Sequence, residues 1–139
     1  MATVIRAEIS EKNKYWIDKH RHYELKHFCL QYPEWKKKLV SLNQAMITMS
    51  KLEKQPGSNV HNDITAAQAL KRVHLMDKID LIERAALEAD EYLYEYIIKA
   101  VTEGLSFTYL KSTMNIPCGK DMYYDRYRRF FWILSNMRN

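Results

Sequence analysis

The chain has 139 residues, 47% of them apolar, which suits one globular domain with a packed core. Three glycines and three prolines are too few for collagen, a low-complexity chain or a β-sandwich of many short strands. No apolar run is long enough to cross a bilayer, and the first residues lack the pattern of a secretory signal. We therefore expect an all-α, cytoplasmic protein with no membrane partner.

The net charge of +5 is distributed unevenly along the chain. Residues 11–40 carry 8 bases and 4 acids, residues 41–100 carry 7 and 9, and residues 101–139 carry 6 and 3. Two basic ends thus flank an acidic middle, and a polyanionic partner would suit the ends. Most acids of the middle are expected to be solvated, although a basic surface on a polymerase or a second subunit could meet them.

Two helices are predicted in the first part of the chain. Residues 12–32 have a loose helical pattern that should end by Tyr32, because Pro33 disfavours helical geometry in the residue before it. Apolar side chains then recur at steps of four and three from Trp35 to Met49, which predicts a second, amphipathic helix. The three lysines between Trp35 and Leu39 most simply form its solvated flank. We expect residues 1–55 to form an N-terminal helical hairpin.

A loop and a long third helix are predicted next. Pro56 and Gly57 mark a loop over residues 56–64, and either Asp63 or the capping-box pair Thr65 and Gln68 should start the helix. Apolar residues keep helical spacing over 75–89. This seam could pair with the seam at 35–49 within the chain, which we favour, or form the interface of a homodimer. One compact domain overall is expected.

The last 50 residues predict a helix-turn-helix unit. Asp90 can cap a first helix that ends at Gly104, and Ser106 can cap a short second helix over 107–114. Asn115 enters left-handed geometry at low cost and Pro117 blocks continuation, so the chain should turn sharply there. A third helix over 120–136 follows, with a buried seam formed by Tyr123, Tyr127, Phe130 and Leu134.

The opposite side of this third helix is polar, basic and aromatic near its N-terminus, which matches a helix that enters the major groove of DNA end-first. Arg128 and Lys120 could contact guanine or phosphate, and Asp121 or Asp125 could accept a hydrogen bond from cytosine. The alternative is that the segment YYDRYRRFFW only packs and is solvated. The predicted DNA-binding residues are Ser106, Thr108, Lys111, Lys120, Asp121, Tyr124, Asp125, Arg126, Arg128 and Arg129.

The block EYLYEYIIKAVTEGLSFTYLKSTMNIPCGKDMYYDRYRRFFWIL resembles the C-terminal helix-turn-helix of phage and prophage transcription regulators of the RinA and ArpU type, which are similar to region 4 of sigma factors. The segments YWIDKHRHYELKHFCLQYPEWKKKL and QALKRVHLMDKIDLIERAAL resemble the N-terminal helices of such proteins. The resemblance implies activation of late phage genes through promoter DNA and host RNA polymerase, in the cytoplasm of a bacterium. Asp121, Asp125 and Gly119 depart from it, since they place negative charge and a flexible residue where phosphates crowd.

Catalysis and metal binding are not expected. No glycine-rich phosphate loop, GxSxG or HExxH motif or paired carboxylates in a recognisable frame occur, so we expect no enzyme and no cofactor. His20, His22, His27 and Cys29 form the only cluster of metal-ligand types, and surface histidines explain it more simply. Cys29 and Cys118 have neither zinc nor disulfide spacing, which fits two ordinary thiols in a reducing compartment; the helix start after Cys118 could slightly activate its thiol.

Two further functions stay open. A DNA-packaging adaptor like the small subunit of a phage terminase would also use helix-turn-helix units, but it would assemble as a ring. A helical protein-interaction module that modulates a host enzyme would bury the third helix of the unit and have no affinity for DNA.

Overall fold

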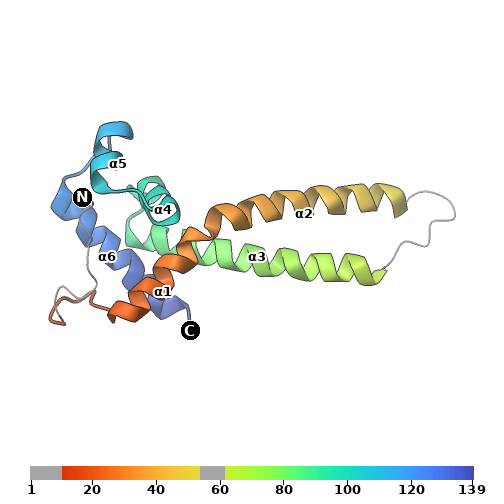
Figure 1. Ribbon diagram of the computed structural model, residues 1–139, viewed down its shortest axis with the longest axis horizontal. Coiled ribbons are helices and arrows are strands. Elements are labelled where there is room, and N and C mark those ends of the chain that lie inside the picture. The colour runs from red at the N-terminus through yellow and green to blue at the C-terminus, as the bar shows by residue number, and fades with distance from the viewer. Residues whose placement is uncertain (1–10, 54–61) are drawn as a thin grey trace. The chain divides into compact units, whose positions relative to one another are not determined.

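The computed structural model describes residues 11–53 and 62–139, and within these residues every regular element is a helix. The six helices are α1 (Lys19–Leu30), α2 (Tyr32–Glu53), α3 (Asn62–Ala89), α4 (Tyr94–Glu103), α5 (Phe107–Thr113) and α6 (Lys120–Met137), as Figure 1 shows. The predicted all-α helical fold is confirmed. The described residues contain no strand.

Local signals explain where most helices begin and end. Asp18 caps α1, because its carboxylate accepts a hydrogen bond from the His20 amide at 3.0 Å. The first helix therefore starts at Lys19, later than the loose pattern from residue 12 indicated. It ends before Tyr32 as predicted, and Pro33 lies in the first turn of α2, where its missing N–H costs nothing.

The start of α3 differs slightly from the prediction. The helix begins at Asn62, so residues 62–64 are helical instead of belonging to the loop, and Thr65 lies inside the first turn. The Pro56-Gly57 part of the predicted loop lies outside the described residues. At the other end, α3 stops at Ala89, close to the predicted stop at Asp90.

The chain is grouped into two compact units, which differs from the expected single domain with an N-terminal hairpin over 1–55. Unit 1 contains residues 11–31 and 81–139, and unit 2 contains residues 32–80. The first helix belongs with the C-terminal helices because it packs on α4 and α6. Within unit 2, α2 pairs with the first part of α3, most of which precedes the predicted seam at 75–89.

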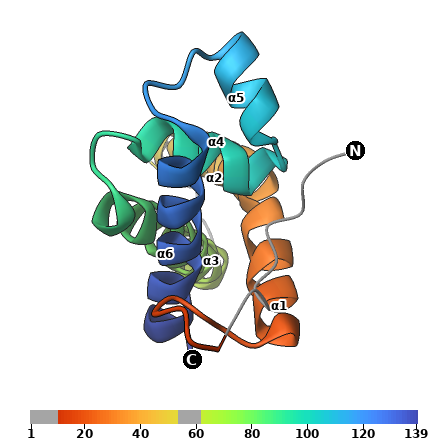
Figure 2. The same cartoon turned by 90° about the vertical axis from the view of Figure 1, so that its left-hand side faces the viewer.

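Unit 1 is a helical bundle with a closed core. In this unit α1 packs against α4 and α6, and α4 packs against α5 (Figure 2). Side chains from four of its helices are fully or almost fully buried: Leu25, Ile97, Leu110, Phe130 and Leu134. This core fixes the two helices of the predicted DNA-binding unit.

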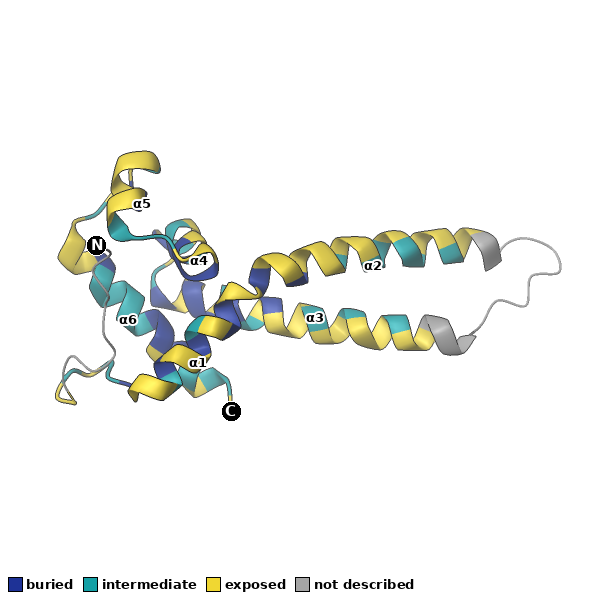
Figure 3. Ribbon diagram, viewed as in Figure 1, coloured by how far each residue is buried: buried dark blue, intermediate teal, exposed yellow. Residues whose placement is uncertain are grey.

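Unit 2 is an antiparallel pair formed by α2 and the part of α3 up to Asp80. The Nε of Arg72 donates to Oδ1 of Asn43 at 2.8 Å, and the Nζ of Lys78 lies 5.3 Å from the ring centroid of Trp35. Trp35 and Ile79 are buried, but the seam further along α2 is only half-buried and much of each helix is exposed (Figure 3). The predicted pairing of the seams at 35–49 and 75–89 therefore holds only for Leu75 and Ile79, because the rest of the second seam belongs to unit 1.

Candidate nucleic-acid interface

The short helix α5 has the predicted cap. Ser106 is extended, with φ −82° and ψ 162°, and its Oγ accepts a hydrogen bond from the Tyr109 amide at 3.2 Å. The preceding helix ends as expected at Gly104, whose φ of 70° is left-handed. Asp90 does not cap α4 itself, because it accepts hydrogen bonds from the Tyr92 and Leu93 amides in the turn before the helix. The helix α4 therefore begins only at Tyr94, later than a cap at Asp90 predicts.

A tight turn joins α5 to α6, and it is built as predicted. Asn115 has a φ of 53°, a left-handed geometry that asparagine adopts more cheaply than most side chains. Ile116 is fully buried, and its amide donates to the Leu110 carbonyl at 3.1 Å. The Nζ of Lys111 donates to the carbonyl of Ile116 at 3.3 Å, so this predicted DNA-binding residue also closes the turn.

Aromatic rings hold the beginning of α6 against α5. The Phe107 ring lies 5.5 Å from the Tyr123 ring and 6.2 Å from the Tyr124 ring. Tyr123 is buried, whereas Tyr124 is half-buried with the Nζ of Lys120 5.9 Å from its ring centroid. Burial raises the pKa of Tyr124, so its hydroxyl stays a neutral hydrogen-bond donor at the surface of the unit.

The α6 helix buries more of its circumference than the predicted seam. Tyr123, Phe130 and Leu134 are buried as expected and Tyr127 is half-buried. Phe131 and Ile133 are buried as well, since α1 covers a second side of the helix. The His22 ring meets the Phe131 ring edge-on at 4.8 Å. Within the segment YYDRYRRFFW, the packing interpretation therefore describes Tyr123, Phe130 and Phe131.

Ion pairing separates Arg126 from the other predicted arginines. Its Nε donates to Oδ2 of Asp90 at 2.9 Å, and its Nη1 pairs with the carboxylate of Asp125. Burial alone would raise the pKa of Asp90, but hydrogen bonds from Arg126 and from the Leu93 and Tyr92 amides outweigh it and hold this pKa below the ordinary value. Arg126 thus ties α6 to the α3–α4 turn, a contact that the sequence did not reveal.

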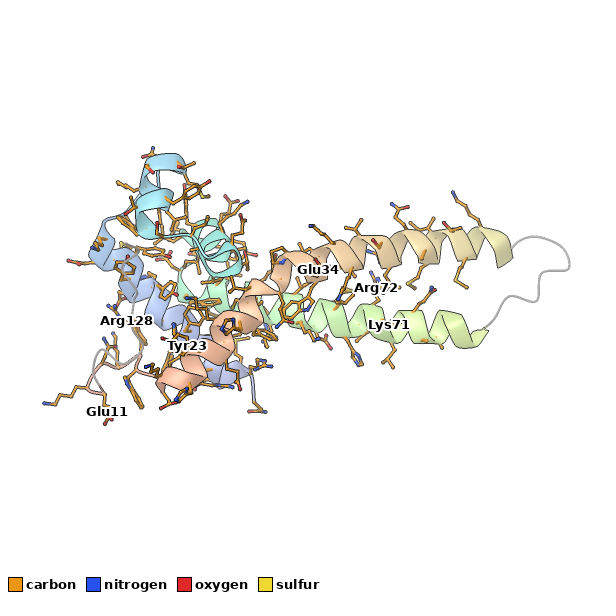
Figure 4. The ribbon with its side chains drawn as sticks, viewed as in Figure 1. Glu11, Tyr23, Glu34, Lys71, Arg72 and Arg128 are labelled. Carbon is orange, nitrogen blue, oxygen red and sulfur yellow. The ribbon has the colours of Figure 1, made fainter. Side chains whose placement is uncertain are left out.

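Arg128 and Arg129, by contrast, form no ion pair with any described residue. Both are half-buried, and the buried Nε of Arg128, which Figure 4 labels on α6, has no acceptor among the described residues. Lys120 and Asp121 are exposed on the first turn of α6, and Thr108 is exposed on α5. We call the surface formed by Lys120, Asp121, Tyr124, Arg128 and Arg129 the α6 face. It is exposed or half-buried, and its three cations have no carboxylate partner among the described residues.

The C-terminal end of α6 is anchored by a residue that sequence reasoning missed. The Nε of Arg21 donates to Oγ of Ser135 at 3.1 Å, and one Nη donates to the Ser135 carbonyl at 3.0 Å and to the Arg138 carbonyl. A cation at this end of a helix complements its dipole. The only indication of this contact in the sequence is the basic character of α1, and that does not identify Ser135 as the partner of Arg21.

The histidines and thiols do not gather into a site. Among the described residues no group of three or more His, Cys, Asp or Glu side chains is placed to hold a metal ion. His20 and His27 are exposed, but His22 is buried, so the interpretation of all three histidines as surface residues was wrong for His22. Burial raises the pKa of Cys29 and of the half-buried Cys118, which contradicts the idea that the helix start activates the Cys118 thiol.

Comparisons of the chain with protein-family models, curated proteins and solved structures find no match. In the part of the chain that the structure describes, no helix combines the length and the apolar character needed to span a bilayer.

Proposed function

We propose that the protein binds double-stranded DNA with sequence preference through α5 and α6, and that it regulates transcription. The observation that carries the proposal is the accessible α6 face, in which Lys120, Arg128 and Arg129 have no carboxylate partner among the described residues. Cations held on a rigid helix without an internal counter-ion suit phosphate and guanine, and Arg is the best donor to guanine.

The supporting helix has a part in the same proposal. A short α5 capped by Ser106 and joined to α6 by a sharp turn is the arrangement in which the first helix crosses the DNA backbone and the second reads base edges. Thr108 and Lys111 on α5 would then contact phosphates. Arg126 is assigned mainly to holding α6 through Asp90, so its removal should weaken folding as well as DNA binding.

Two acids near the start of α6 limit the strength of binding. Asp125 forms an ion pair with Arg126, whereas Asp121 is exposed on the first turn. Asp121 would repel phosphate unless it accepts a hydrogen bond from a cytosine amino group. We therefore propose that the protein alone binds DNA with moderate affinity and that a partner protein supplies additional binding energy.

The resemblance stated above extends the proposal to a phage late-gene regulator that acts with host RNA polymerase in a bacterial cytoplasm, needs no cofactor and is not an enzyme. A homodimer on a two-fold symmetric site is compatible with this role. Transcription from a phage late promoter with purified polymerase, with and without the protein, tests this extension.

DNA binding is tested by selecting duplexes from a random pool and measuring the affinity of the full chain for the selected duplex. Arg128→Ala should weaken binding about 10- to 100-fold, as loss of a contact of about 1–3 kcal/mol predicts. If Lys120 contacts a phosphate, Lys120→Ala should reduce the slope of log affinity against log salt concentration by about one. Lys51→Ala, an exposed lysine of α2, is the charge-matched control and should bind normally.

The opposite results would refute the proposal. A pool from which no duplex is enriched, or equal affinity of wild type and both α6 variants, would show that α6 does not read DNA. A ring of many copies in light scattering would favour the packaging adaptor.

A further inference from the structure

Unit 2 contains a groove that is separate from the α6 face. It has a volume of about 690 Å³ and lies between the first half of α2 and the middle of α3. Figure 4 labels Glu34 on α2 and Lys71 on α3, which lie on the two sides of this groove. We call it the α2–α3 groove; its lining residues are Glu34, Lys37, Lys38, Ser41, Leu42, Lys71, His74 and Leu75.

The floor of the groove is apolar and its rim is basic. Leu42 and Leu75 are half-buried, whereas Lys37, Lys38 and Lys71 are exposed and form no ion pair with a described residue. Glu34 is the one acidic residue among the lining residues, compared with three lysines. An apolar floor with cations on both sides favours an occupant that is apolar on one side and acidic on its flanks.

The shape of the groove favours a helix as that occupant. Both walls are helices, and the half-buried seam of α2 continues beyond Leu42 through Met46 and Met49. A third helix laid along this seam would cover apolar area that the helix pair leaves in water.

A second copy bound through the same groove fits less well. Two-fold symmetry would place the groove against itself, so that lysines would face lysines. Double-stranded DNA fits less well too, because it offers no apolar surface for Leu42 and Leu75.

We propose that the α2–α3 groove binds an acidic amphipathic helix of a partner protein. The apolar face of that helix packs on Leu42 and Leu75, and its flanking carboxylates pair with Lys37, Lys38 and Lys71. This site is independent of DNA binding by α6, so either proposal can fail while the other holds.

The experiment measures binding of a labelled helical peptide, with leucines on one face and glutamates on its flanks, to the full chain by fluorescence anisotropy. Two control peptides keep the composition but scramble the leucine spacing, or keep the spacing and replace glutamate with lysine. Only the acidic amphipathic peptide should bind, and added salt should weaken it.

Variants locate the site. The double change Lys37→Glu and Lys71→Glu should weaken peptide binding at least about tenfold, which corresponds to about 1.4 kcal/mol. Lys51→Glu is the charge-matched control on α2, and Arg128→Ala should also leave peptide binding unchanged. The substituted lysines are exposed, so an unchanged helical signal in circular dichroism verifies that the double variant is folded.

Three outcomes would overturn the proposal. The first is equal binding of the peptide by wild type and the double variant. The second is self-association that the double variant abolishes, since this assigns the groove to another copy. The third is loss of DNA binding in the double variant with no binding of the acidic peptide, which assigns the groove to nucleic acid.

Discussion

Leu25, Phe130 and Leu134 in the core of unit 1 are completely buried, whereas Leu42 and Leu75 in the apolar seams of unit 2 are only half-buried. Both units are built from amphipathic helices, so the difference comes from the number of helices that share the apolar surface. Unit 1 closes its core with helices on several sides, and a pair of helices cannot do this. Unit 2 should therefore open locally more easily, and its uncovered apolar surface favours a partner.

The largest expected effect follows from the closed core of unit 1. Phe130→Ala should lower the free energy of unfolding by about 3–5 kcal/mol, because it leaves a cavity in a fully buried site. Urea unfolding followed by circular dichroism measures this loss.

The comparison with unit 2 uses Met46→Ala at a half-buried position of the α2 seam. It should cost about 1–2 kcal/mol, because a half-covered side chain loses less transfer free energy. Equal losses for the two variants would contradict the contrast between the units.

A smaller effect is expected at the ion pair that joins the α3–α4 turn to α6. Asp90→Asn should lower the free energy of unfolding by about 1–2 kcal/mol at neutral pH, since it removes a charged hydrogen bond to Arg126. Because the pKa of Asp90 is lower in the folded state, its contribution is present above the ordinary value of 3.8 and is lost as the pH falls through the folded value.

Wild type should thus lose stability in acid more steeply than Asp90→Asn, as thermal unfolding at several pH values would measure. Asp121→Asn, at an exposed position of α6, is the control and should follow the wild-type profile. Parallel pH profiles for wild type and Asp90→Asn would rule out the proposed linkage.

The smallest effect concerns the cap of α5. Ser106→Ala should cost about 1 kcal/mol, because it removes the acceptor for the Tyr109 amide. Ser112→Ala, at an exposed position within α5, is the matched control and should change stability by only a few tenths of a kcal/mol. Similar effects of both changes in thermal unfolding would mean that the cap does not stabilise the unit.

The helix-turn-helix could be predicted because its signals are local. Gly104, Ser106 and Asn115 each act on backbone groups within a few residues, so their roles follow from residue type and order. The end of the first helix before Pro33 follows for the same reason, although Tyr32 is itself helical as the first residue of α2.

Long-range pairing could not be predicted in this way. Arg126 meets Asp90, 36 positions earlier, and Arg21 meets Ser135, 114 positions later, and no periodicity identifies such partners. The apolar pattern of α1 was too loose to distinguish α2 from α4 and α6 as its neighbour. The burial of His22 was predicted wrongly because histidine occurs both on surfaces and in cores. Its position in the core depends on its neighbour Phe131, which the sequence does not identify.

The unequal burial of the two thiols provides a reporter at the proposed interface without any substitution. Cys29 is sealed in the core of unit 1, while Cys118 lies half-exposed in the turn that enters α6. A maleimide dye should therefore attach to the native chain at Cys118 alone, slowly at neutral pH because that thiol stays protonated. Duplex DNA seated on α6 would shield this position, so the labelling rate itself becomes a measure of occupancy.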